Sequence, residues 1–149
     1  MIDILKIAIG SDHGGYKLKE DIKEYLARKG YDVVDVGTYS TASCHYPEYG
    51  AKCARLVADG VCQFGVVVCT TGEGITMAAN KVKGVRAGLA YNVEVAKLMR
   101  EHNDANVIGF GAKFTTTEEA IERMDAFLNA KFSAGRHATR VEMLNNLDK

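Results

Sequence analysis

Short apolar runs alternate along the chain with segments in which hydrophobic residues recur every three or four positions. The runs predict buried strands, and the three-to-four spacing predicts amphipathic helices. We expect strands at residues 4–9, 31–36, 64–69, 85–90 and 106–110, and helices at 15–29, 47–59, 75–81, 93–102, 116–130 and 136–147. This alternation predicts an α/β fold, a three-layer, doubly wound, Rossmann-like sheet of five parallel strands with helices on both faces and a C-terminal helix.

Individual residues support the boundaries of these elements. The run 64–69 is the most continuously apolar segment, as expected for a central strand that helices cover on both faces. Pro47 stands where the first turn of a helix accepts proline, and Thr116 with Glu119 predicts a capping box. In the helix at 15–29 the Lys and Glu residues are expected on the solvated face.

The composition excludes several classes of protein. A chain of 149 residues is long enough for one core, so a single domain over 1–149 is expected. Lys and Arg total 19, as do Asp and Glu, and this balance argues against a nucleic-acid partner. No window approaches the roughly 20 apolar residues of a membrane span, and the N-terminus lacks a basic region followed by an apolar run. We therefore expect a cytoplasmic protein with no membrane partner.

The four cysteines favour neither a disulfide framework nor a metal site. They contain no Cys-x-x-Cys pair, and Cys44-His45 has no second spaced pair to complete a zinc site. Cys53 and Cys62 are expected to pack as small hydrophobic side chains. No metal and no cofactor is therefore expected, which leaves Cys69 as the thiol with chemical interest.

Polar residues cluster where the predicted strands end. Ligands of open parallel sheets bind beyond the carboxyl ends of the strands. The segments that fall there are Ser11–Gly15, Tyr46, Cys69–Gly74, Tyr91-Asn92 and Gly111–Lys113. His102 and Asn103 instead close a helix and belong at the other end of the sheet, so a neighbouring subunit would have to bring them to the site.

The segment Cys69–Gly74 joins a buried strand to a helix and carries glycines that let a ligand approach the backbone. Amides at a helix N-terminus bind anions and stabilise developing negative charge, and the same field lowers the pKa of a thiol such as Cys69. The alternative is a tight turn with an inert cysteine. The segment matches neither a Walker A loop nor a dinucleotide fingerprint.

Two further groups have both a functional and a structural interpretation. Asp12 and His13 suit recognition of a sugar hydroxyl or a phosphate, or they form a solvated loop pair. Arg136 and Arg140 lie one helical turn apart and suit a phosphate dianion, or they form an exposed basic face. His102 alternatively complements a helix dipole.

The ordered combination of motifs is more specific than any one of them. These are Gly10–Gly15, Asp35–Thr38, Tyr46-Pro47, Cys69–Gly74, Ala78–Lys81, His102–Asn106 and Gly135–Arg140. In this order they resemble the type B ribose-5-phosphate isomerases, over nearly the whole chain. The wider family includes galactose-6-phosphate and allose-6-phosphate isomerases and some enzymes for shorter sugar phosphates.

The resemblance implies a metal-independent aldose–ketose isomerisation of a sugar phosphate through a cis-enediolate. By that resemblance Cys69 is the base between C1 and C2, Thr71 assists it, and His102 helps to open the furanose ring. The substrate-binding residues it implies include the amides of the catalytic loop, the sugar contacts and the phosphate contacts: Thr70, Gly72, Gly74, Asp12, Tyr46, His13, Arg136 and Arg140. Homodimers or homotetramers with shared active sites are implied, the partner supplying His102 and Asn103.

The chain departs from the family pattern at three positions. Thr70 replaces the usual glycine, Glu73 replaces an apolar residue, and Lys113 replaces a common third phosphate arginine. These changes bear on the identity of the sugar more than on the type of reaction. Ribose 5-phosphate is the expected substrate; the alternatives are another aldose phosphate (galactose 6-phosphate, allose 6-phosphate or a tetrose phosphate), a non-catalytic sugar-phosphate-binding module, and a cysteine hydrolase.

Overall fold

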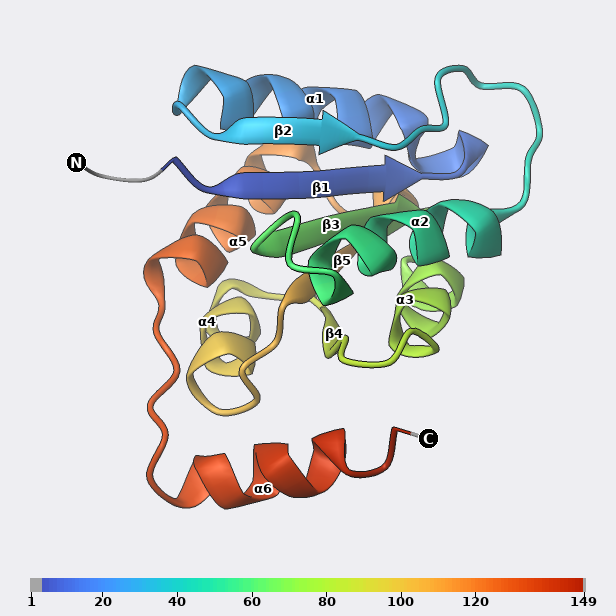
Figure 1. The fold of residues 1–149 in the computed structure, drawn as a ribbon. Helices are drawn as coiled ribbons and strands as arrows, with labels where there is room; N and C mark the ends of the chain where they lie inside the picture. The colour runs from blue at the N-terminus through green and yellow to red at the C-terminus, as the bar shows by residue number, and fades with distance from the viewer. Residues whose placement is uncertain (1–3, 149) are drawn as a thin grey trace.

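The computed structural model describes residues 4–148, which form one parallel sheet with helices around it (Figure 1). The strand order is β2-β1-β3-β5-β4. The strands are β1 (Lys6–Ser11), β2 (Asp32–Asp35), β3 (Phe64–Cys69), β4 (Ala87–Leu89) and β5 (Val107–Gly111). From β1 the chain passes to β2 on one side, and β3 then lies on the other side of β1. The sheet therefore changes winding direction between β1 and β3, which is where ligands of such folds bind.

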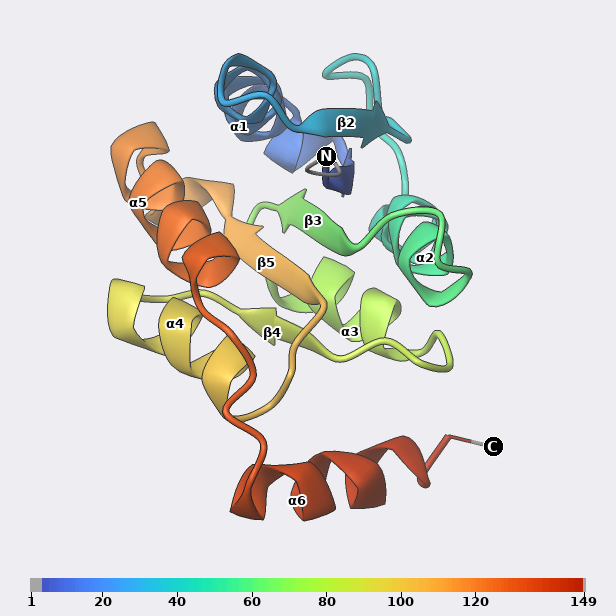
Figure 2. The same ribbon diagram turned by 60° about the vertical axis from the view of Figure 1, so that its left-hand side comes forward.

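Six α-helices complete the architecture, with 3-10 turns at His13–Gly15 and Ala112–Phe114. They are α1 (Tyr16–Arg28), α2 (Tyr46–Ala58), α3 (Glu73–Asn80), α4 (Val93–Glu101), α5 (Thr117–Asn129) and α6 (Arg136–Asn145). One face of the sheet is covered by α1, α4 and α5 and the other by α2 and α3, while α6 lies beyond the β4 edge (Figure 2). The predicted fold class, with five parallel strands and a C-terminal helix, is confirmed.

Alternate residues of β3 serve the two cores. Val66 and Val68 pack into the core beneath α1, α4 and α5, whereas Val67 and Cys69 pack into the core beneath α2 and α3. All four side chains are at most 5% exposed, as a central strand requires. The last of them places the Cys69 thiol on the face covered by α3, at the carboxyl end of the sheet.

Four of the five strands differ from their predicted ranges, and β1 and β4 differ most. β1 continues to Ser11, which is paired with Val68 of β3. β4 has three residues rather than the six predicted, beginning only at Ala87. At its start the backbone N–H of Arg86 donates to the side chain of Asn106 at 2.8 Å, a bond that replaces strand pairing.

The prediction that the lysines of the first helix lie on its solvated face is wrong for Lys19. Its side chain is fully buried and its ammonium group lies 2.6 Å from Asp35 at the end of β2. The rings of Tyr16 and Tyr39 flank the same nitrogen at 5.3 and 5.6 Å. Lys19 is buried because a carboxylate and two aromatic faces replace its hydration.

The predicted helix starts are confirmed at two positions. Pro47 lies in the first turn of α2, and Thr116 and Glu119 form both hydrogen bonds of the capping box of α5. In contrast, α6 buries only Val141 against the rest of the chain. Across the described residues no helix is both long and apolar enough to span a bilayer.

Candidate active site

The loops after β1 and β3 meet at the point where the sheet changes direction. The backbone N–H of Asp12 donates to the carbonyl of Val68 at 3.3 Å, and the Asp12 carboxylate accepts the Gly15 amide at 3.1 Å. A methyl group on Gly15 would lie 2.4 Å from that same carbonyl, so only glycine permits this approach. The Asp12 side chain, 7% exposed, is thereby fixed at the carboxyl end of β1.

The Cys69 thiol is held by the loop that follows it. The Gly72 amide donates to Cys69 Sγ at 3.2 Å, and this turn requires the left-handed φ of 80° at Gly72. Thr71 Oγ1 accepts the Glu73 amide at 3.2 Å, which leaves the hydroxyl proton of Thr71 free to donate. The loop therefore holds the Cys69 sulfur and the Thr71 hydroxyl side by side at the carboxyl end of β3.

Two other thiols, Cys53 and Cys62, are buried in the core. Cys53 is fully buried, and this burial raises the pKa of its thiol to about 12. Cys62 is 2% exposed, and burial also raises its pKa. Both side chains pack in the core as the sequence predicted.

Thr70 and Lys113 lie on the side of the loop that faces α1 and α5. The Lys113 amide donates to the Thr70 carbonyl at 3.0 Å, which ties the loop after β5 to the loop after β3. The Thr70 hydroxyl lies 2.2 Å from where a methyl group on Gly14 would stand. A cavity of about 460 Å³ opens here, between the start of α1 and the segment that joins β5 to α5. Its lining includes Gly14, Lys17, Thr70, Lys113 and Thr116.

On the opposite side of the loop, the Tyr46 ring covers the first turn of α3. A methyl group on Gly74 would lie 2.7 Å from Tyr46 Cε1, so the bare Cα of this glycine accommodates the ring. The ring remains 41% exposed and available to a ligand. His13 lies near this rim, where its Nδ1 accepts the Cys44 amide at 3.2 Å.

A second cluster of predicted site residues lies at the other end of the sheet. His102 follows α4, which returns the chain to the amino end of β5, and its ring stacks on His137 of α6 at a centroid distance of 4.2 Å. A cavity of about 210 Å³ lies here, lined by His102, Asn103, His137, Arg140 and two apolar residues of α6. Arg136 begins the same helix and is exposed.

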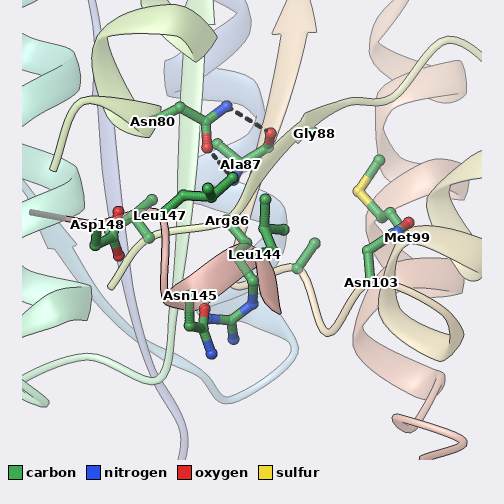
Figure 3. Close-up of a pocket in the computed structure, with 12 residues that line it drawn as sticks. Asn80, Arg86, Ala87, Gly88, Met99, Asn103, Leu144, Asn145, Leu147 and Asp148 are labelled. Atoms are coloured by element: carbon green, nitrogen blue, oxygen red, sulfur yellow. Dashed lines mark hydrogen bonds between the residues drawn. The ribbon is translucent and has the colours of Figure 1, made fainter. Parts of the chain in front are cut away.

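A wider groove of about 460 Å³ adjoins this cluster, between β4 and α6 (Figure 3). Asn80 bridges to both backbone groups of Ala87 on its rim. Leu144 of α6 and Leu147, just beyond the end of that helix, line it opposite Met99. Asn103 belongs to both cavities. The His102 cluster and this groove therefore form one continuous surface along α6.

The structure thus divides the predicted site residues into two groups. At the carboxyl end of the sheet lie Asp12, His13, Tyr46, Lys113 and the loop Thr70–Gly74 with Cys69. At the other end lie His102, Asn103, Arg136 and Arg140. The length of the strands separates the two ends of the sheet. Within one chain, the two groups therefore do not meet.

The sequence analysis missed three residues that shape these groups. Gly14 makes room for Thr70, and Cys44 orients His13 through its backbone amide. No sequence pattern relates these positions, because each contact joins separate loops. His137 lies between the two arginines of the α6 motif, but its sequence position does not indicate the contact with His102. In residues 4–148 no three His, Cys, Asp or Glu side chains come together in a way that could hold a metal ion.

The fold and its thiol-bearing loop define a Rossmann-like α/β protein with polar loops where its sheet changes direction, the place where folds of this class bind small ligands. A family model described as Ribose/Galactose Isomerase matches residues 7–144. The chain belongs to this family and is an isomerase. It is 41% identical to ribose-5-phosphate isomerase B of Escherichia coli, with 97% of each chain covered.

Solved structures agree with this assignment. Ribose-5-phosphate isomerase B of Clostridium thermocellum superimposes with a TM-score of 0.95 at 46% identity, covering 96% of this chain and 97% of that one. The Mycoplasma genitalium enzyme with bound ribulose-5-phosphate superimposes with a TM-score of 0.91 at 40% identity, covering 95% of each chain.

Proposed function

We propose that this chain interconverts ribose 5-phosphate and ribulose 5-phosphate, without a metal, through a cis-enediolate. The observation that carries the proposal is the Cys69 thiol at the end of β3, with the Gly72 amide 3.2 Å from its sulfur. The Mycoplasma genitalium relative, whose structure holds ribulose-5-phosphate, supports the choice of a pentose phosphate.

In the proposed reaction, the Cys69 thiolate removes the proton from C2 of the open-chain aldose. The C2–H electron pair forms the C1–C2 double bond, and the carbonyl oxygen becomes the enediolate oxygen. Amides of Thr70, Gly72 and Gly74 line the loop where this charge develops, and Thr71 offers its free hydroxyl proton. Return of the proton to C1, with the O2 proton passing to O1, gives the ketose.

Substrate binding is assigned to the residues around this loop. Asp12, held by the Gly15 amide, and Tyr46, over α3, are proposed to contact the sugar. His13 accepts the Cys44 amide at Nδ1, so its Nε2 carries the proton of the neutral ring and donates to the substrate phosphate. Lys113 adds a cation on the same side.

We further propose that the active sites are shared within a homodimer or homotetramer. His102, Asn103, Arg136 and Arg140 would then reach the Cys69 loop of a neighbouring copy, because they lie at the opposite end of their own sheet. In residues 4–148 no carboxylate pairs with either arginine, which leaves both guanidinium groups for the phosphate. His102 would open the furanose ring.

The reaction is tested by incubating the protein with ribose 5-phosphate in heavy water and a chelator, and following ketose formation and C2 deuteration by NMR. We expect turnover with chelator present, near-complete loss in Cys69→Ala, and parent activity per folded protein in Cys62→Ala, a core thiol outside both groups of site residues. Undiminished exchange in Cys69→Ala would remove this residue as the base. Binding without turnover would favour a binding module, and faster conversion of a tetrose or hexose phosphate would replace the substrate.

Shared sites are tested by mixing two inactive variants. Cys69→Ala and His102→Ala damage different groups, so a mixed dimer contains one site with both defects and one intact site. Random exchange of subunits would restore about a quarter of the parent activity. Mixing without recovery, under conditions where subunits exchange, contradicts the arrangement.

We also propose that residues 1–149 form one catalytic domain that works in the cytoplasm; residues 1–3 and 149 lie outside the described part. All four cysteines are free thiols, and a catalytic thiolate is retained in a reducing compartment. Fractionation of the producing cells, with activity found in the cytoplasmic fraction, is the expected result.

A further inference from the structure

Two imidazole rings that are 35 positions apart in the sequence stack against each other. The centroids of His102 and His137 are 4.2 Å apart, and the planes differ by 13°. His102 ends α4, where its backbone N–H donates to the Leu98 carbonyl at 2.8 Å. His137 lies in the first turn of α6. The stack therefore joins the turn that carries His102 to the helix that carries the two arginines.

The His137 ring lies flat against the His102 ring and restricts its plane. Among residues 4–148 no hydrogen bond is formed by either nitrogen of this ring. The nearby polar contact between the segments joins backbone groups, with the Ser133 amide donating to the Glu101 carbonyl at 2.9 Å. Without His137 the His102 side chain would keep its backbone position but lose the surface that fixes χ2, a torsion that is broad on its own.

The charges around the pair favour a neutral His137. Partial burial and then the neighbouring His102, Arg136 and Arg140 hold the pKa of His137 below its ordinary value. Glu101, at the end of α4, is the carboxylate nearest in sequence, and its side chain is directed to Lys97 at 3.9 Å. A neutral ring stacks on His102 without charge repulsion and leaves both His102 nitrogens free to exchange protons.

We propose that His137 is a positioning residue that orients the His102 ring for opening of the sugar ring. The inference rests on the proposed function, in which His102 performs this step. On opening, the C1 hydroxyl loses its proton, the C1–O4 bond breaks as the aldehyde forms, and O4 gains a proton. Both transfers need an imidazole held in one plane, and a misplacement of about 1 Å costs roughly 100-fold in rate.

Two reactions of the same enzyme separate this role from general structure. Ribose 5-phosphate is a furanose and must open before C2 reacts. Ribulose 5-phosphate cannot close such a ring, because its C5 oxygen carries the phosphate. Exchange of its C1 proton for deuterium therefore uses the Cys69 loop and the phosphate site but needs no ring opening.

We expect His137→Ala to lower kcat for ribose 5-phosphate about 10- to 100-fold while C1 exchange of ribulose 5-phosphate stays within about threefold of the parent. His137→Phe keeps a flat ring for stacking and should retain most of kcat. His102→Ala should show the same selectivity, and adding His137→Ala to it should cause little further loss. Thr139→Ala, an exposed change on the same helix, is the matched control.

Equal loss in both reactions would overturn the proposal and assign His137 to phosphate binding or assembly. Unchanged kcat in His137→Ala, or additive losses in the double variant, would overturn it as well. If the parent protein catalyses neither reaction, the proposed function is wrong and this inference falls with it. If the parent is active and the selectivity is absent, only the inference fails.

Discussion

The contact between Gly14 and Thr70 offers a quantitative test of how the loop Thr70–Gly74 is packed. A methyl group on Gly14 would lie 2.2 Å from Thr70 Oγ1, whereas ordinary contacts begin near 3.4 Å. Gly14 does not have a left-handed φ, so Gly14→Ala tests this contact rather than the backbone. Accommodating the methyl group forces Thr70 to rotate or the loop to shift, which costs about 1–3 kcal/mol.

The assay is a double-mutant cycle measured by urea unfolding at fixed protein concentration. Gly14→Ala alone should destabilise the protein by about 1–3 kcal/mol, whereas in the Thr70→Gly background it should be neutral or stabilising by about 0.5 kcal/mol. Thr70→Ser retains the hydroxyl and should not rescue. A coupling energy below about 0.5 kcal/mol would show that the loop relaxes freely and would refute the packing constraint.

Three further outcomes are expected. Lys19→Met should lower the free energy of unfolding in urea by about 3 kcal/mol, the low end for a broken buried pair, because Lys23 still lies 2.9 Å from Asp35. Burial alone would raise the pKa of Asp35, but hydrogen bonds from both lysines lower this pKa below its ordinary value. The contribution of Asp35 to the free energy of unfolding is therefore complete above the unfolded-state pKa and is lost as pH falls through the lower folded-state pKa. Asp35→Asn should flatten this part of the stability–pH curve. Asp104 has a φ of 49° and forms ion pairs with Arg100 at 2.9 Å and Arg86 at 3.4 Å, beside the turn that carries His102. Both Asp104→Ala and Asp104→Gly remove these ion pairs and should lower isomerase turnover. The Ala variant should unfold at a lower urea concentration than the Gly variant, because glycine relieves the backbone strain.

Local patterns predicted the elements of this fold well, because each pattern reports the surroundings of its own residues. The apolar run 64–69 is the central strand, and Thr116 with Glu119 caps α5. Lys19 shows where such reasoning fails. Its helical position resembles that of any exposed lysine, and its burial depends on Asp35 and two tyrosines brought in by other segments.

For the candidate site, the sequence located the segments but not the contacts among them. Cys69 and Asp12 could be placed at strand ends because parallel strands share one edge. The pairing of Thr70 with Gly14 joins two loops, and the stack of His102 on His137 joins two helices, so neither follows from the spacing of residues. Both arise from the strand order and from the path of the chain into α6, which tertiary packing decides.

Charged side chains are distributed differently between the two groups of candidate site residues. The loop that presents Cys69 offers amides and hydroxyls, but the charged side chain in it is the anion Glu73, which is exposed at the start of α3. Arg136 and Arg140, which pair with no carboxylate of residues 4–148, lie at the opposite end of the sheet. A chain with no net charge thus places Arg136 and Arg140 at one end of the sheet and the Cys69 thiol at the other. In the proposed homodimer, two copies related by a twofold axis would bring the arginines of each copy to the thiol of the other.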